Sequence, residues 1–329
     1  MSIPKKIHYC WLSGDPYPDD IQRCIDSWHK YMPDYEFVLW DMNMFDSSKW
    51  RYASEALSKK KYAFASDVVR LYALYTEGGI YLDSDIEVYR SFDPLLENSA
   101  FSCMESGGRF AAWLMGSEPG NPLINELLYY YEDKSFLRED GSMDLTPNTI
   151  PTTRTLSKYG MEPVNRLQKL EHITIYPEEY FCPKNPWTGK INITNNTYAM
   201  HLFTGAWNDT AKEDLSFFGG VADYITDLIR TGKIDREKSC YIFGAGTVGN
   251  LVFEAMRMNG CEPKGFIVTK RDTAWKETDG IPIHEISECG DIIKKECVLV
   301  SVLPKGQGGI CQTLKKNGFT KMICIGEDL

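Results

Sequence analysis

Two aspartates separated by one residue, Asp83 and Asp85, are the side chains of this sequence best suited to do chemistry. They follow the apolar run IYL, which favours a buried strand. In a strand, residues two apart project from one face, so the two carboxylates would repel each other there. A hard divalent cation relieves that repulsion and can bridge carboxylates to a diphosphate. The pair therefore predicts a metal site, with two solvent-facing turn residues as the alternative.

Three further polar side chains, Ser66, Asp67 and Arg70, lie in the segment just before the aspartates. Residues 62–76 have the pattern of a helix, closed by a double glycine. Asp67 and Arg70 are three apart and share one helix face, so an ordinary intrahelical ion pair would explain them. The functional alternative gives sugar hydroxyls to Asp67 and phosphate charge to Arg70.

The elements that must position these residues alternate between strands and helices, which indicates an α/β fold. KKIHYCWL and YEFVLWD are predicted strands, DDIQRCIDSWHKYM is a predicted helix, and IYLDSDIEVY is predicted as one continuous strand. TPNTIPTT is predicted to be a connection because it is rich in proline and threonine. A polar hinge, TGKIDREKS, precedes a second strand, glycine turn and helix. We expect two domains, 1–232 and 233–329, with the boundary near Lys233.

Composition narrows the class of partner. The formal net charge is -10, from 46 acidic and 36 basic residues, so the chain would repel nucleic acid and anionic lipid over long range. The ten cysteines show no metal-binding spacing, which favours reduced thiols. No signal peptide or long apolar run is evident. We expect a cytoplasmic protein without a transmembrane segment, with peripheral association at the inner membrane face as its one compatible membrane role.

A glycine turn, GAGTVG, opens the second domain with Gly244, Gly246 and Gly249 at G-x-G-x-x-G spacing. Between a strand and a helix, this spacing presents amides to a diphosphate and predicts a second nucleotide site. The following strand, FIVTK, lacks the acidic residue that usually binds ribose, which counts against NAD. The unit resembles the small nucleotide-sugar-binding domains of bacterial sugar acyltransferases. Glycines that serve tight packing alone are the alternative.

Four sequence blocks in order resemble glycosyltransferase family 32: IPKKIHYCWLSG, SWHKYMPDYEFVLWD, FASDVVRLYALYTEGGIYLDSDIEVY and AMHLFTGAW. The family includes fungal α-1,6-mannosyltransferases and is similar to the catalytic core of clostridial glucosylating toxins. The resemblance covers roughly the first 210 residues and is most specific in the third block. It implies a GT-A domain, followed here by a small Rossmann-like α/β domain.

The resemblance also implies a nucleotide-diphosphate sugar donor, Mn²⁺ or Mg²⁺, and transfer with retention. Asp67, Arg70, Asp83 and Asp85 would form the catalytic group. Matched residue by residue, Trp11 would contact the nucleobase, Ser66 would lie by the nucleotide, and Asp67 and Arg70 would contact the sugar. Tyr81 would precede the DXD motif. Within the motif, Asp83 would contact ribose and metal-bound water, and Asp85 would contact the metal.

His201 and Trp207 complete the predicted site near the end of the resemblance. Related enzymes place a late histidine or acid at this position, so His201 is a candidate third metal ligand beside Asp83 and Asp85. Trp207 would lie on a loop that closes over the donor. Both residues could instead be ordinary structural ones.

The function expected from these observations is a retaining hexosyltransferase. A UDP-sugar is the favoured donor, and the acceptor would be a glycan or lipid-linked glycan in surface polysaccharide biosynthesis. An effector that glycosylates a protein is the second hypothesis. An NAD-dependent oxidoreductase that uses the glycine turn is the third.

Overall fold

The computed structural model describes residues 2–105, 109–138, 141–162, 164–185, 190–204, 221, 224–235, 240–270, 277–278 and 281–326. The chain forms two compact units, Met1–Asn208 and Asp209–Leu329. This division lies before the boundary predicted near Lys233. Helical residues 224–230 are held by the second unit, because the Tyr224 hydroxyl donates to the Cys324 carbonyl at 3.3 Å. An α/β fold is confirmed in both units.

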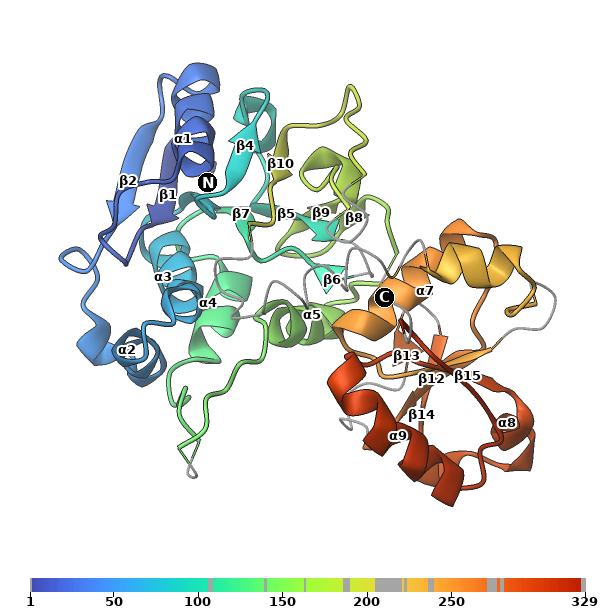
Figure 1. Ribbon diagram of the computed structural model, residues 1–329. Coiled ribbons are helices and arrows are strands. Elements are labelled where there is room, and N and C mark those ends of the chain that lie inside the picture. The colour runs from blue at the N-terminus through green and yellow to red at the C-terminus, as the bar shows by residue number, and fades with distance from the viewer. Residues whose placement is uncertain are drawn as a thin grey trace. The chain divides into compact units, whose positions relative to one another are not determined.

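An eight-stranded mixed sheet forms the centre of the first unit, in the order β2-β1-β3-β7-β5-β9-β8, with β6 paired to β5 (Figure 1). A separate two-stranded sheet pairs β10 with β4. The strands are β1 (Lys6–Cys10), β2 (Glu36–Trp40), β3 (Gly79–Leu82), β4 (Ile86–Val88), β5 (Ala100–Glu105), β6 (Arg109–Phe110), β7 (Leu114–Ser117), β8 (Gln168–Lys169), β9 (Thr174–Tyr176) and β10 (Ala199–His201).

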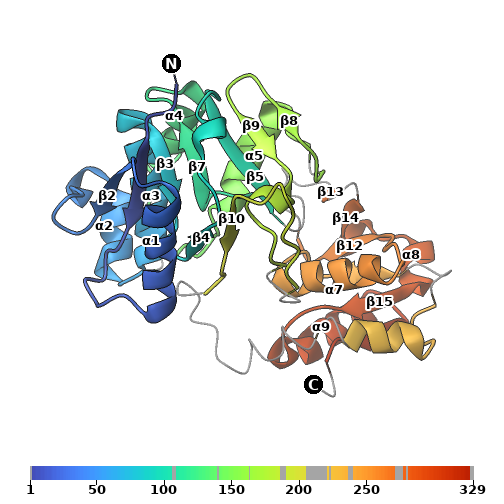
Figure 2. The ribbon, with the colours of Figure 1, turned by 90° about the horizontal axis from the view of Figure 1, so that it is seen from above.

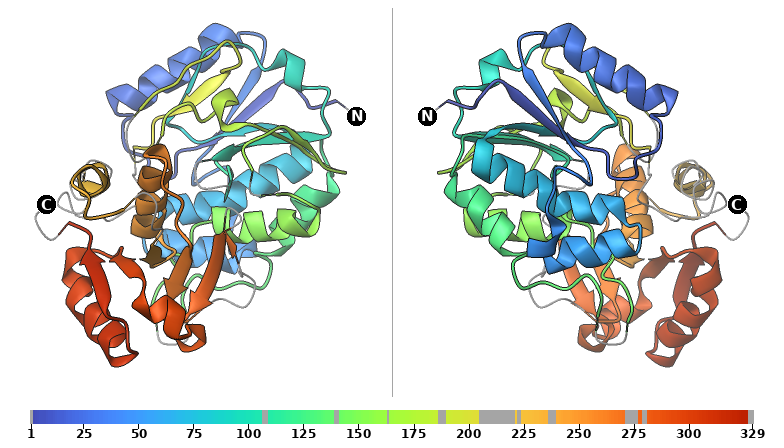
Figure 3. Two further views of the ribbon diagram at one scale, coloured as in Figure 1. Left: turned by 90° about the vertical axis from the view of Figure 1, so that its right-hand side faces the viewer. Right: turned by 90° about the vertical axis from the view of Figure 1, so that its left-hand side faces the viewer.

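Helices lie on both faces of this sheet, and Figure 3 shows α1 and α3 on opposite sides of it. The α-helices are α1 (Asp19–Tyr31), α2 (Arg51–Ser58), α3 (Tyr62–Glu77), α4 (Pro122–Tyr129) and α5 (Thr149–Lys158). Single 3-10 turns are η1 (Ser47–Lys49), η2 (Asp93–Leu95) and η3 (Glu178–Tyr180).

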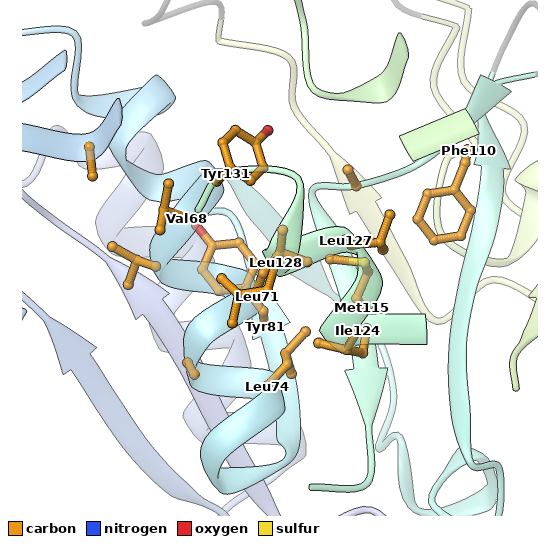
Figure 4. Close-up of a cluster of buried hydrophobic side chains, with 14 of the residues drawn as sticks. Val68, Leu71, Leu74, Tyr81, Phe110, Met115, Ile124, Leu127, Leu128 and Tyr131 are labelled. Carbon is orange, nitrogen blue, oxygen red and sulfur yellow. The ribbon is translucent and has the colours of Figure 1, made fainter. Parts of the chain in front are cut away.

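Helix α3 is the central helix of the unit and is buried along most of its length. Its residues Val68, Leu71 and Leu74 belong to a hydrophobic cluster that includes Ile124 and Leu127 of α4 (Figure 4). Burying side chains of this kind contributes about 1.5–3 kcal/mol each. The packing fixes the register of α3, and therefore the position of the polar side chains on its first turns.

A double glycine connects α3 to β3 because no other residue fits. Gly78 and Gly79 have φ of 65° and 106°. A Cβ on Gly78 would lie 2.6 Å from Pro119, and one on Gly79 would lie 2.7 Å from the Lys6 carbonyl oxygen. The tight link places β3 directly after the helix. The carboxyl end of β3 then lies at the same sheet edge as that of its parallel neighbour β1.

The predicted continuous strand through Asp83 and Asp85 is wrong. The backbone turns there, with the amide of Ile86 donating to the carbonyl of Asp83 at 3.2 Å, so β3 and β4 enter different sheets. Helix α1 runs alongside β4 (Figure 2), where the Trp28 indole donates to the Ile86 carbonyl at 2.6 Å. The two aspartates therefore do not share one strand face. The acidic turn thus follows β3, a strand inside the mixed sheet, where the polar side chains at the start of α3 can reach it.

The connection predicted at TPNTIPTT is also wrong, because most of it forms the start of α5. Pro151 occupies the first turn of that helix. Its missing N–H is not needed at this position, since the first amides of a helix have no intrahelical acceptor.

The second unit contains a six-stranded sheet in the order β13-β14-β12-β11-β15-β16, parallel except at β13. Its elements are β11 (Tyr241–Phe243), α7 (Thr247–Met258), β12 (Gly265–Val268), β13 (Glu277–Thr278), β14 (Ile281–Glu285), η4 (Ile286–Glu288), α8 (Asp291–Lys295), β15 (Cys297–Val300), α9 (Pro304–Lys316) and β16 (Lys321–Cys324). The parallel strands have the order of a doubly wound fold, with its switch point between β11 and β15.

Candidate active site

Arg70 lies at the centre of the site and is only 4% exposed. Its Nη1 donates to the carbonyl of Ala112 at 2.7 Å and its Nε to that of Ser66 at 3.3 Å. Its Nη2 lies 3.2 Å from Oδ1 of both Asp67 and Asp83. Burial alone would lower the pKa of Arg70, but the surrounding acidic groups, led by Asp83, hold the pKa above its ordinary value. Arg70 is therefore a fixed buried cation.

Asp67 is shared between two partners. Besides Arg70, the side-chain amide of Asn148 donates to Asp67 Oδ1 at 2.6 Å. Asn148 immediately precedes α5, far along the chain. Burial raises the pKa of Asp67 to about 7, although Arg70 opposes the shift. A buried carboxyl group with a specific cationic partner and a strongly shifted pKa is typical of functional sites.

Asp83 leaves β3 facing Arg70 and Tyr81. The Tyr81 hydroxyl donates to Asp83 Oδ1 at 2.9 Å, and the Arg70 guanidinium lies 4.8 Å from the centroid of the Tyr81 ring. The Asp83 side chain is 28% exposed, against 5% and 8% for Arg70 and Asp67. Asp83 is therefore the most exposed of these three side chains.

Asp85 has a separate set of partners. Its Oδ1 lies 3.1 Å from His201 Nε2, and its Oδ2 accepts from both the amide and the hydroxyl of Thr204 at 3.0 Å. Burial alone would raise the pKa of Asp85, but the charge of His201 and these hydrogen bonds hold the pKa well below its usual range. Burial has the opposite effect on His201 and alone would lower the pKa of this residue, but the charge of Asp85 raises that pKa above its usual value. The two residues form a buried ion pair.

The predicted metal ligands are only partly assembled. The structure brings Asp85 and His201 together, whereas Asp83 Oδ1 faces Tyr81 and Arg70. Over the described part of the chain, no group of three or more His, Cys, Asp or Glu side chains is arranged to hold a metal ion. Asp85 Oδ1 and His201 Nε2 lie 3.1 Å apart and share a hydrogen bond. Both atoms would be available to a divalent cation once His201 Nε2 has lost the proton that it donates to Asp85.

The remaining predicted donor residues lie in different surroundings. Ser66 is buried, donates to the Ala63 carbonyl at 2.7 Å and accepts from Arg70 Nη2 at 3.1 Å. Trp11 follows β1 at the same sheet edge as Asp83. Its indole donates to the Asp15 carbonyl at 2.6 Å and its ring packs edge-on against Tyr17. Trp207 lies outside the described residues.

Sequence analysis missed three residues of the site: Asn148, Thr204 and Trp113. Asn148 contacts Asp67 and Thr204 contacts Asp85, while the Trp113 ring lies 4.6 Å from that of His201. Thr204 stood inside a block that matched the family and could have been selected there. Asn148 and Trp113 carry no spacing or motif that would single them out.

The second predicted nucleotide site, the glycine turn after β11, is described by how closely its glycines pack against neighbouring backbone. A Cβ on Gly249 would lie 1.7 Å from the Gly244 carbonyl oxygen, and one on Gly244 would lie 3.0 Å from the Ser301 carbonyl oxygen. Gly246 has open space around it. Two of the three glycines are therefore required by close packing between β11, α7 and the end of β15.

Comparison with known proteins finds a family match within the first unit. Residues 18–102 match the family model described as "Glycosyltransferase sugar-binding region containing DXD motif". Inositol phosphoceramide mannosyltransferase 3 of Schizosaccharomyces pombe is 32% identical over 134 residues, which are 39% of this chain and 36% of that protein. An uncharacterized glycosyltransferase of Acanthamoeba polyphaga mimivirus is 24% identical over 66% of this chain and 88% of its own length. The chain spans about a third of the first of these relatives.

Among solved structures, the apo-form glycosyltransferase GlyE of Streptococcus pneumoniae TIGR4 aligns with 99% of this chain and 93% of its own. The TM-score is 0.37 at 10% identity. The DXD of the matched family model corresponds to Asp83, Ser84 and Asp85, the turn around which the polar network is built. Residues 18–102 of this chain thus resemble a glycosyltransferase sugar-binding region of the DXD-containing type.

Proposed function

We propose that the protein is a metal-dependent glycosyltransferase that transfers a sugar from a nucleotide-diphosphate sugar, with retention, to a glycan or lipid-linked glycan acceptor. The observation that carries the proposal is the convergence of the Arg70 cluster and the Asp85–His201 pair on the turn after β3. Gathering five ionisable groups in one small region, with Asp67, Arg70 and Asp85 buried, is costly unless a ligand uses them. A donor with a diphosphate and a sugar supplies both charge and hydroxyl groups for them.

In this proposal the two halves of the site divide the donor between them. Asp85 and His201 would hold the divalent cation, with Asp83 acting through water and the ribose. When bound, the cation supplies a Lewis acid that offsets charge on the departing diphosphate. Arg70 adds a fixed positive charge that needs no reorganisation during the reaction. Asp67, held by Arg70 and Asn148, accepts hydrogen bonds from sugar hydroxyls and sets the orientation of the ring.

A UDP-sugar remains our favoured donor, and surface polysaccharide biosynthesis our favoured role. The matched relative is named a mannosyltransferase, so GDP-mannose belongs beside the UDP-sugars in any screen. No helix within the described ranges is long and apolar enough to cross a membrane.

The experiment that tests the proposal is donor hydrolysis by the full chain, with UDP- and GDP-sugars in the presence of MnCl₂. We expect turnover of one donor, its loss on adding EDTA, and a reduction of about 100-fold or more in Asp85→Asn, because charge stabilisation of the diphosphate is lost. Asp291→Asn, an exposed position of α8, is the control and should retain activity. Full activity in EDTA would refute metal dependence, and full activity of Asp85→Asn would refute the site.

A further inference from the structure

His201 is held without the hydrogen bond that usually orients a metal-binding histidine. Its Nε2 faces Asp85, while Nδ1 is buried and has no hydrogen-bond partner among the described residues. Histidines that bind metal normally donate from the second ring nitrogen to a carboxylate, a carbonyl or water, which fixes the ring and its tautomer. Apart from the hydrogen bond of Nε2 with Asp85, the orientation of this ring therefore depends on the side chains packed against it.

Two aromatic rings flank the imidazole. The centroid of Trp113 lies 4.6 Å from that of His201, and the centroid of Phe203 lies 4.0 Å from it. Phe203 has φ of 54°, a left-handed conformation that is strained for a bulky residue and that persists only where the surroundings impose it. Packing between Trp113 and Phe203 restricts rotation of the His201 ring.

Trp113 is itself fixed by a side chain outside the predicted site. Its indole Nε1 donates to Oε2 of Glu105, the last residue of β5, at 3.0 Å. Its backbone carbonyl accepts from the amide of Asp83 at 2.9 Å, and the carbonyl of the preceding Ala112 accepts from Arg70. The short turn before β7 thus contacts both halves of the site.

We infer that Trp113 and Glu105 are positioning residues for His201: Glu105 anchors the indole, and the indole holds the imidazole directed at Asp85. This inference rests on the proposed metal role of His201. The alternative is that Trp113 is an ordinary buried aromatic whose loss lowers only stability. The Glu105 carboxylate accepts the hydrogen bond of the indole, and its charge also raises the pKa of His201, so a glutamine in its place keeps the hydrogen bond and removes the charge.

The first measurement needs no metal. The protein has five histidines, so a chain labelled with ¹³C at the histidine rings gives few signals, and His201→Ala identifies that of His201. We expect Trp113→Phe and Glu105→Ala to shift and broaden the His201 signal because the ring becomes mobile. Glu105→Gln should keep the His201 signal as sharp as in the wild type, because the indole stays anchored, while the lost charge moves its position. A His201 signal as sharp in Trp113→Phe and Glu105→Ala as in the wild type would overturn the inference.

The second measurement is Mn²⁺ binding by calorimetry and by loss of the free-ion signal in electron paramagnetic resonance. Trp113→Phe and Glu105→Ala should weaken Mn²⁺ binding by about 10–100-fold, the usual cost of losing an outer-shell partner, and Glu105→Gln by much less. Trp40→Phe is the matched control, because it also removes a buried indole that donates to a histidine, His8, at 3.1 Å. It should leave Mn²⁺ affinity unchanged.

The two measurements separate failure of the inference from failure of the proposed function. If His201→Ala loses Mn²⁺ binding while Trp113→Phe and Glu105→Ala retain it, the positioning role is refuted and the metal role stands. If the wild type binds no Mn²⁺ although the His201 signal responds to Trp113→Phe, the metal role is refuted, and Trp113 is confirmed as holding the ring.

Discussion

Two strand ends in this molecule carry motifs associated with diphosphate binding, and they are built in opposite ways. After β3, Asp83 and Asp85 meet charged and polar side chains from α3 and from the chain after β10. After β11, Gly244 and Gly249 lie so close to neighbouring backbone that no side chain would fit. The turn after β3 is surrounded by charged side chains, whereas the turn after β11 contains glycines, whose lack of a side chain lets the backbone pack closely.

The difference shows what distinguishes a site from a motif. Burying a cation and several carboxylates costs free energy that packing alone does not require, so their convergence needs a functional reason. Glycines between a strand and a helix have a sufficient reason in close packing of the backbone. Packing therefore accounts for Gly244 and Gly249, and nucleotide binding beside Gly246, which has open space around it, stays a prediction.

The largest expected effect comes from removing the central cation. Arg70→Ala leaves Asp67 and Asp83 buried without their counter-charge, which should lower the free energy of unfolding by about 3–5 kcal/mol. The matched change in the second unit is Arg257→Ala, whose partner Glu262 lies 3.4 Å away in an exposed pair. That variant should lose no more than about 1 kcal/mol. Equal losses in urea unfolding of the two variants would contradict the distinction.

The next effect tests the packing role of the glycines. Gly249→Ala places a methyl group against the Gly244 carbonyl and should cost about 1–3 kcal/mol or more, because the helix must shift. Gly246→Ala has open space and should change the free energy of unfolding by only a few tenths of a kcal/mol. Thermal unfolding measures both. A harmless Gly249→Ala would show that β11 and α7 are not closely packed there.

Hydrophobic patterning predicted most elements of the fold, because α1 buries one regular face and α3 is apolar on most sides and buried along most of its length. It failed where local geometry departs from the pattern. The turn at Asp83 interrupts an apolar alternation that looks like one strand, and α5 contains a proline and several threonines that favour other structures. Both depend on contacts outside the segment concerned, which the local pattern does not contain.

The residues of the candidate site also divide into those that the local sequence pattern predicts and those that it does not. Asp67, Arg70 and Asp83 lie within one helix and the next strand, so their proximity follows from spacing. Asn148 reaches Asp67 across 81 residues, and Thr204 reaches Asp85 across 119. Asparagine and threonine are common in turns, and only the folded sheet brings these two to the carboxylates.

Asp67 provides a pH-dependent test of the first unit. Its pKa is about 7 in the fold, against about 3.9 in an unfolded chain, so between these values the folded state binds the additional proton. The free energy of unfolding should therefore fall as pH rises from 5 to 7. Relative to Asp67→Asn, which does not titrate and keeps Oδ1 for Asn148, the fall should reach up to about 1.4 kcal/mol per pH unit. Parallel stability curves for the two proteins would refute the raised pKa.

The smallest expected effect is the difference between two serine-to-alanine substitutions, one in each unit. Ser301→Ala removes a hydroxyl that donates to the Phe243 carbonyl at 2.6 Å, but the Ser301 amide still donates to that carbonyl at 3.1 Å. We expect a loss of about 0.5–1.5 kcal/mol and unchanged sugar transfer. Ser66→Ala removes an acceptor of the buried Arg70 guanidinium, so it should cost about 1.5–3 kcal/mol and also slow transfer.

Urea unfolding and donor hydrolysis on both serine variants measure this difference of about 1 kcal/mol, the interval between a neutral and a charged hydrogen bond. A slower transfer reaction in Ser301→Ala would mean that the end of β15 contributes to catalysis, and the glycine turn beside it would then need a role beyond packing. Unchanged transfer in Ser66→Ala would indicate that Arg70 does not act on the donor, because the hydroxyl that Arg70 Nη2 contacts could then be lost without consequence for the reaction.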